Sequence, residues 1–299
     1  GKYDWTSFKK LNRTSSLLGI LLMTCGSLLF AWKDGIVKVT AGYYSPVLII
    51  WFQLCCMSAI WLPILIYRHG WNQLIPRPLS WQIARGLSLV TGVGLFYWSV
   101  MLIPLADTTA MTFSSPLVGA ALSPVMLGEK TGFHRWSAVV IGFVGAILIL
   151  RPGFGGDSLG YITAFGSGLC IGFFFTTNRK LAHAGAPFAS IVYPAYLGAV
   201  IISPFIPFKW TTPRVEDTWL IIGFVIITFL SQTMFIASVR YGQASLVAPF
   251  QYLHIVAATF FGYIFFSDFP DLITWIGITV IVASGVYIAI RENIRQAHD

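Results

Sequence analysis

Charged residues are scarce in this chain. Asp, Glu, Lys and Arg make up 10% of its 299 residues, whereas apolar residues make up 56% and the mean hydropathy is +0.76. Soluble domains carry about 25% charged residues, so this composition excludes a water-soluble fold. The net charge is +8, but the cations are spread singly over short polar stretches. Without a basic stripe, no nucleic-acid partner is predicted.

Groups of residues that bind metals or perform catalysis are also missing. The four cysteines lie in apolar segments, with no C-x-x-C pair and no histidine at ligand spacing. This excludes a disulfide framework and a metal site. His254 is the only histidine expected near mid-membrane, and no carboxylate lies near it in sequence. Since an embedded enzyme needs clustered acid, base or metal ligands, we expect no enzyme, no catalytic residues and no cofactor.

Long apolar runs, by contrast, follow one another almost without interruption. A spanning helix needs about 20 mostly apolar residues, and short breaks rich in charge, Pro or Gly separate such windows. The fold class predicted is an all-α membrane protein with ten transmembrane helices. Their approximate ranges are 16–38, 46–67, 80–103, 106–127, 134–150, 158–180, 187–208, 217–240, 244–266 and 271–290.

The positive charges predict the orientation of these helices. If the N-terminus is cytoplasmic, thirteen of the nineteen Lys and Arg residues fall on the inner side and four on the outer side. The remaining two, Lys33 and Arg85, lie within predicted helices. Because cytoplasmic loops collect Lys and Arg, we expect a multi-pass protein of the inner (cytoplasmic) membrane with both termini cytoplasmic.

Two matching motifs indicate an internal duplication. Glu129 and Asp268 each end an apolar segment, and each is followed seven residues later by a tryptophan, Trp136 or Trp275. Both matches have the same offset of 139 residues. A repeat of five helices is odd, so its second copy enters the membrane from the opposite side. The sequence therefore predicts two inverted five-helix repeats, at 1–152 and 153–299, as in many transporters.

Three stretches carry a family resemblance. They are Leu127-Gly-Glu followed by Ala138-Val-Val-Ile-Gly, Leu105-Ala-Asp-Thr-Thr-Ala-Met-Thr-Phe-Ser-Ser-Pro, and Ala244-Ser-Leu-Val-Ala-Pro-Phe-Gln-Tyr with Asp268-Phe-Pro-Asp. The chain resembles the drug/metabolite transporter superfamily, in particular its EamA-domain members, and most of all the bacterial branch with S-adenosylmethionine and riboflavin carriers. The resemblance implies alternating access, driven by exchange or by a gradient, without ATP hydrolysis.

The ninth and fourth segments hold the first group of candidate substrate-binding residues. In the ninth segment they follow Pro249, which permits the irregular backbone that a membrane tolerates where it lines a cavity. The fourth segment is its counterpart in the first repeat, and the two should face each other. Interhelical hydrogen bonding is the alternative role, and His254 is either a core residue or a proton carrier. These candidates are Gln251, Tyr252, His254, Ser114 and Ser115.

Charged residues within the apolar segments are the second group, because each is costly there unless it faces a cavity or a partner. Lys33 and Asp34 point about 100° apart on a helix, so we expect them to face different surroundings. Asp34 would then pair with Lys38, and Lys33 would reach either the outer surface or the cavity. Arg85 is either an interfacial anchor or a site for a carboxylate or phosphate.

Aromatic side chains and acidic helix ends complete the candidates. Aromatic surface at cavity depth suits a flat or cationic cargo, and we place Tyr97, Trp98, Tyr193 and Tyr196 there. The acids are candidate gates or structural groups: Asp34, Asp107, Glu129, which would cap a helix or pair with Lys130 or Arg135, and Asp268.

The sequence thus predicts a secondary transporter of a small polar or amphipathic metabolite. The expected cargoes are S-adenosylmethionine-like or riboflavin-like compounds, with export of amino acids, aromatic metabolites or drugs as the alternative. A channel or a non-transporting scaffold is the alternative from another class. The expected partners are a small-molecule substrate, a coupling proton or counter-substrate, and the lipid bilayer, with the protein a monomer or homodimer.

Overall fold

The structure is a computed structural model that describes residues 5–150, 157–182, 184, 187–241 and 247–296. The predicted repeat boundary at 152/153 and the predicted start of the ninth segment at 244 lie outside these residues. Every regular element in the described ranges is helical, in agreement with the all-α prediction. The α-helices are α1 (Trp5–Val39), α2 (Pro46–His69), α3 (Leu79–Leu102), α4 (Leu105–Thr112), α5 (Ser115–Leu127), α6 (Phe133–Leu150), α7 (Ser158–Lys180), α8 (Pro187–Ile202), α9 (Ile206–Lys209), α10 (Thr218–Tyr241), α12 (Leu253–Phe266) and α13 (Leu272–Gln296), and the 3₁₀ turns are η1 (Trp71–Leu74), η2 (Ser203–Phe205), η3 (Val215–Asp217) and η4 (Ala248–Tyr252).

Within these ranges, ten helical segments are long and apolar enough to cross a membrane, which confirms the predicted count. Three of the ten are composite: α4 with α5, α8 with η2 and α9, and η4 with α12. In two of them a proline lies in the first turn after the break, Pro116 in α5 and Pro204 in η2, and in the third Pro249 lies in the 3₁₀ turn η4 that precedes α12. Proline lacks the N–H that would continue the preceding helix, so the chain changes helical geometry at these points.

The two repeats share element boundaries. Adding 139 residues to α3 (Leu79–Leu102) gives 218–241, the range of α10. The same offset relates the helix-ending residues Gly128 and Ser267, which both adopt the left-handed conformation, with φ of 69° and 56°. Each repeat holds five spans, so the second runs through the membrane in the opposite sense. The fold is therefore a pair of inverted five-helix repeats.

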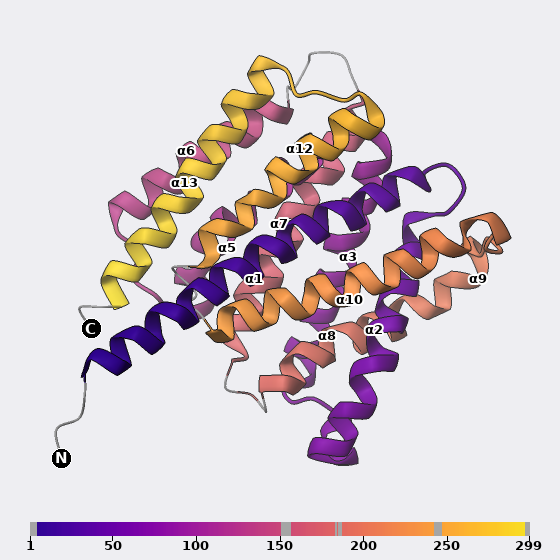
Figure 1. Cartoon of the computed structure of the whole chain (residues 1–299), viewed down its shortest axis with the longest axis horizontal. Helices are drawn as coiled ribbons and strands as arrows, with labels where there is room; N and C mark the ends of the chain where they lie inside the picture. The colour runs from indigo at the N-terminus through magenta and orange to yellow at the C-terminus, as the bar shows by residue number, and fades with distance from the viewer. Residues whose placement is uncertain (1–4, 151–156, 183, 185–186, 242–246, 297–299) are drawn as a thin grey trace.

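Helix packing follows this pseudo-two-fold relation. The first span of each repeat packs along the third span of the other, as α1 with α10 and α7 with α3. Equivalent helices also meet each other directly. Figure 1 shows α6 beside α13 along one edge of the bundle and α2 beside α8 toward the opposite edge. Because nearly every major contact joins the two repeats, neither half buries its own apolar surface alone.

The broken spans meet on the pseudo-axis. Phe113, at the break between α4 and α5, corresponds by the 139-residue offset to Tyr252, at the end of η4. Their rings lie 5.1 Å apart between centroids. Two equivalent residues touch only if both lie near the symmetry axis. The expectation that the fourth and ninth segments face each other is thus confirmed, and both break at the centre of the bundle.

Two glycines let α7 approach α4 and α5 closely. A Cβ at Gly172 would lie 2.5 Å from the Cβ of Val118 and 2.8 Å from the carbonyl oxygen of Ser115, and Gly168 faces the carbonyl of Met111. Small residues at such crossings allow the close backbone contacts on which membrane helices rely. Gly168 and Gly172 therefore set the distance between the second repeat and the break in the first.

Replacing Gly172 by alanine should lower thermal stability in detergent by about 1–3 kcal/mol, because the added methyl forces two backbones apart. Gly223 on α10 provides the matched control, since a Cβ there meets no atom within 4 Å. Gly223→Ala should leave the melting temperature unchanged or raise it, as alanine favours helix. Equal melting temperatures for the two variants would contradict this account of the α7 crossing.

Candidate functional site

Five polar side chains from both repeats form one buried network. The ammonium of Lys33 on α1 lies 3.2 Å from the carboxylate of Asp34 and donates to the hydroxyl of Tyr97 at 3.0 Å. The other carboxylate oxygen of Asp34 lies 2.8 Å from Nε2 of His254 on α12. The Tyr97 hydroxyl in turn donates to the amide oxygen of Gln53 on α2. The network thus connects four spanning helices across the repeat interface.

These groups are deeply buried. The side chains of Lys33 and Asp34 are 7% and 1% exposed, and Tyr97 is fully buried. Removing two charges from water costs several kcal/mol per ion, which the pair recovers only with good geometry and further hydrogen bonds. An apolar pair of similar size would hold α1 in place at lower cost. The network is therefore poorly explained by stability alone.

Aromatic rings enclose the network. The Lys33 ammonium lies 5.3 Å from the ring centroid of Phe30 and 5.1 Å from that of Tyr97, within cation–π range. The His254 ring stacks on Phe30 at 6.0 Å and meets Phe113 edge-on at 5.8 Å. The break on the pseudo-axis and the charged groups therefore share one aromatic-walled region at the centre of the bundle.

The structure corrects the sequence interpretation of α1. Lys33 and Asp34 face the same network, because the flexible lysine side chain bridges the angle between adjacent helical positions. Asp34 does not pair with Lys38, whose ammonium instead bonds Asp268 and the carbonyl of Ile103, both at 2.9 Å. No carboxylate lies near His254 in sequence, but Asp34 reaches it from 220 residues away in the chain.

The other candidates of the fourth and ninth spans lie outside the network. Tyr252 packs its ring among apolar residues and directs its hydroxyl toward Gly285 of α13. Gln251 is half-buried in the same 3₁₀ turn. Ser114 and Ser115 are buried at the break, where α7 covers them. These residues shape the central break, whereas His254 is the member of the group that reaches the charged cluster.

The four aromatic candidates lie in three different places in the structure. Tyr97 belongs to the network, but its neighbour Trp98 is 43% exposed on the bundle surface, so its predicted place in the cavity is wrong. The cause is the 100° turn between adjacent helical residues. Tyr193 and Tyr196 donate their hydroxyls to the carbonyls of Gln73 and Leu74. They attach the loop between α2 and α3 to α8, away from the network.

Arg85 points into the bundle and is fully buried, so it is no interfacial anchor. Its guanidinium donates from Nη1 to Asn178 and Ser190, each at 3.2 Å, and from Nη2 to Gln82 at 2.5 Å. It lies twelve residues before Tyr97 on α3, or about 18 Å along the helix axis. The chain thus carries a second buried cation, well separated from Lys33.

Two ion-paired clusters join the repeats at opposite ends of the bundle. At one end Lys38, from the first span of repeat one, bonds Asp268 after the fourth span of repeat two. At the other end Arg179, from the first span of repeat two, bonds Glu129 after the fourth span of repeat one. Glu129 also lies 3.4 Å from Arg135, one of the partners that the sequence left open for it. The two acids occupy equivalent positions and are tied in equivalent ways.

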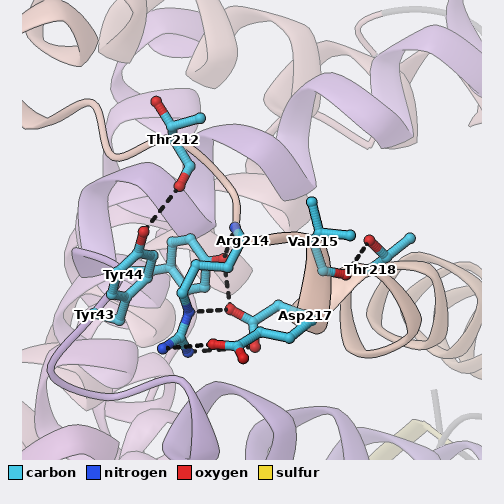
Figure 2. Close-up of polar contacts among 8 residues, drawn as sticks. Tyr43, Tyr44, Thr212, Arg214, Val215, Asp217 and Thr218 are labelled. Carbon is cyan, nitrogen blue, oxygen red and sulfur yellow. Dashed lines mark hydrogen bonds and ion pairs between the residues drawn. The ribbon is translucent and has the colours of Figure 1, made fainter.

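Further polar contacts close the Lys38 end. Figure 2 shows Tyr43 and Tyr44, between α1 and α2, meeting Arg214 and Asp217 ahead of α10. The Tyr44 hydroxyl donates to Asp217 at 2.7 Å, and the Arg214 guanidinium lies 4.0 Å from the Tyr43 ring centroid. Burial and the bond to Asp217 raise the pKa of Tyr44 above its usual value. This loop contact, which the sequence did not reveal, ties repeat one to repeat two.

Asp107 contributes another link of this kind. It is buried in the first turn of α4 and accepts a hydrogen bond from the Tyr161 hydroxyl at 2.5 Å. Tyr161 belongs to α7, so the bond joins the two repeats. Asp107 is therefore part of the contact between the repeats and not an isolated helix cap.

A small cavity of about 10 Å³, room for roughly one water molecule, lies between α2 and α10 beside the network, with Gln53 and Thr228 among its lining residues. At the equivalent place in the other half, Gly86 and Gly198 bring α3 and α8 together. The position equivalent to Gly86 is Val225, whose larger side chain lines the cavity. Small-molecule sites measure roughly 300–1,000 Å³, so a metabolite enters only if the helices move apart.

Comparison with known proteins shows which family has this architecture. Residues 17–151 and 158–290 each match the EamA-like transporter family. The S-adenosylmethionine uptake transporter of Rickettsia felis is 28% identical, over 81% of this chain and 82% of the relative. The riboflavin transporter of Vibrio cholerae is 26% identical, over 93% of this chain and 94% of the relative.

A human protein and a solved structure extend the comparison. Solute carrier family 35 member G1 of Homo sapiens is 29% identical over 93% of this chain and 78% of that protein. A solved crystal structure with 16% sequence identity superposes with a TM-score of 0.60, covering 93% of this chain and 97% of the other, and so shares the fold. With both repeats matched by one family model, the chain belongs to the EamA-like transporter family of the drug/metabolite transporter superfamily.

Proposed function

We propose that the protein is a secondary carrier that moves a small polar or amphipathic metabolite across the cytoplasmic membrane by alternating access, driven by exchange or by a gradient. In this proposal both termini are cytoplasmic, and the repeats are the two bodies that rock against each other. The buried network of Lys33, Asp34, Tyr97, His254 and Gln53 is the observation that carries the proposal. It sits where the repeats meet, and its charges are costly to keep in a membrane.

The chemistry around the network favours a cargo with a flat ring and a polar or cationic group. Asp34 is the acceptor for a cation, and Phe30, Tyr97 and Phe113 offer ring faces. S-adenosylmethionine has a purine and a sulfonium, and riboflavin has a tricyclic ring with a polar chain. Two relatives carry the names of these cargoes. Export of amino acids or aromatic metabolites remains the second candidate, since the same groups bind them.

Flux into proteoliposomes tests the proposal. The purified protein should give saturable, cold-competed uptake of labelled S-adenosylmethionine or riboflavin, and preloading the vesicles with unlabelled cargo should accelerate it. Folded protein that binds a cargo but moves none would contradict the carrier proposal. Unitary currents in planar bilayers would instead indicate a channel.

His254 offers a separate test of how transport is driven. Its imidazole lies against the Asp34 carboxylate, with Lys33 and Tyr97 as the other ionisable groups in contact with that network. Because His254→Gln replaces an imidazole that can carry a proton by an amide that cannot, it should abolish the response of uptake to an imposed pH gradient. Exchange of labelled for unlabelled cargo should persist within about threefold, since it needs no net proton movement.

His134, exposed at the start of α6, is the control for that variant. His134→Gln should leave both gradient-driven uptake and exchange unchanged. If His254→Gln still responds to the pH gradient, the proton does not use this histidine. Loss of exchange together with the pH response would instead make His254 a residue needed for cargo binding.

A further inference from the structure

Arg85 is a buried charge without a counter-charge. Its three hydrogen-bond partners, Gln82, Asn178 and Ser190, are all neutral, and no carboxylate pairs with it in the part of the chain that the structure describes. Its Nε is also buried without a hydrogen-bond partner there. The guanidinium is fully charged at any physiological pH. The fold therefore encloses a permanent cation that the described residues do not neutralise.

This arrangement is costly and is not required by the architecture. Buried charges in proteins are normally paired, and charged residues within spanning segments are rare because they are costly there. The equivalent position in the second repeat is Phe224, an apolar residue that is also buried. The same helix–helix contact is thus built with and without an arginine. Something other than packing accounts for Arg85.

We infer that Arg85, with Gln82, Asn178 and Ser190, forms a binding subsite for the carboxylate of a zwitterionic cargo. The inference rests on the proposed carrier function and assigns its cargo class. The planar guanidinium fork matches the two oxygens of a carboxylate, and the surrounding amide and hydroxyl groups add hydrogen bonds. A bound anion supplies the missing charge. The cationic group of the cargo has its acceptor in Asp34 at the central network, about 18 Å farther along, so the two charges are bound in turn and not at the same time.

The subsite lies between the central network and one end of the bundle. Tyr193, one turn from Ser190 on α8, bonds the backbone of Gln73 in the loop that covers this end. Tyr196 fastens the same loop through Leu74. The offset of twelve residues from Arg85 to Tyr97 corresponds to about 18 Å along the helix. Arg85 is therefore a binding position that the cargo reaches when this end opens, and Asp34 is the next binding position along the transport path.

Matched pairs of probes that differ in an anionic group test the subsite. The pairs are S-adenosylmethionine with its decarboxylated form, methionine with its methyl ester, and riboflavin 5′-phosphate with riboflavin. Binding to the purified full-length protein is measured by calorimetry and by thermal protection. At least one carboxylate-bearing probe should bind, and Arg85→Met should weaken it at least tenfold, as removal of one partner of a buried charged pair does. Arg85→Lys should weaken it less.

Binding of the partner probes without the anion should change less than twofold in Arg85→Met, as should binding of every probe in Arg68→Met, which removes an exposed arginine at the end of α2. The ligand-free Arg85→Met protein should melt at or above the wild-type temperature, because the variant removes an uncompensated buried charge. A lower melting temperature would make Arg85 structural and overturn the inference.

Three further results would overturn the carboxylate subsite: no binding of any carboxylate-bearing probe, equal losses for both members of each pair, or a loss confined to riboflavin 5′-phosphate. These binding results are independent of flux. A protein that binds through Arg85 but moves nothing would contradict the carrier proposal and leave the subsite standing. If the protein moves an uncharged cargo and Arg85→Met changes the binding of no probe, the carrier proposal stands and the subsite is contradicted.

Discussion

Replacing Asp34 by alanine should abolish uptake and lower the stability of the protein by about 3–5 kcal/mol, the cost of leaving a buried charge without its partner. Asp34 is 1% exposed and is the carboxylate that neutralises Lys33, 3.2 Å away. It also holds His254 at 2.8 Å from the second repeat. Thermal unfolding in detergent and proteoliposome uptake measure the two effects separately.

The double variant Lys33→Met/Asp34→Leu separates stability from function. Apolar replacement of a buried ion pair is often neutral or stabilising, so the double variant should regain most of the lost stability while uptake stays absent. Glu216→Ala is the control at an exposed pair, because Glu216 is 71% exposed and its bond to Arg214 is worth at most about 1 kcal/mol. Uptake by the double variant would show that the pair is only a structural element.

The sequence predicts the fold well because the membrane simplifies the problem. Each span must satisfy its own backbone hydrogen bonds, so a long apolar run already determines a helix. The match between Glu129 and Asp268 then provides the repeat, and an odd number of spans requires its inversion. Pro116 and Pro249 also mark the breaks in advance, because proline cannot continue a helix.

The site is predicted less well, because it depends on contacts between distant segments. His254 finds Asp34 across 220 residues, and Gln53 gives no signal in sequence although it accepts a bond from Tyr97. The helical period shows that adjacent side chains such as Tyr97 and Trp98 point in different directions, but it does not show which of the two directions is buried. For Lys33 and Asp34 the prediction of different surroundings was wrong, because the long lysine side chain reaches a partner that its direction from the backbone does not indicate.

Symmetry gives the end clusters a common role. Lys38 with Asp268 and Arg179 with Glu129 are related by the repeat, so the inversion places them at opposite ends of the bundle. Both are intact in this structure, and both join the repeats. Alternating access requires one end to separate while the other stays closed. In the proposed carrier each cluster would therefore oppose the opening of its own end, and weakening one should favour one state only.

Charge reversal at these acids should shift the carrier in opposite directions. Asp268→Lys sets a cation against Lys38 and should favour the state open at that end. Glu129→Lys does the same against Arg179 and Arg135 at the other end. The groups are partly exposed, so each reversal is worth about 1–3 kcal/mol, a roughly 5–150-fold change in the ratio of the two states. Uptake should fall in both variants, because each favours one state.

Spin-label distances across each end measure the shift. One pair of labels replaces Val39 and Phe269 and the other replaces Val125 and Phe175, all exposed positions with one label in each repeat. Asp268→Lys should lengthen only the first distance and Glu129→Lys only the second. The swap Lys38→Asp with Asp268→Lys should restore the wild-type distance and uptake, because it rebuilds the ion pair in reverse. If both reversals lengthen the same distance, or the swap fails to rescue, these clusters do not hold the two ends closed.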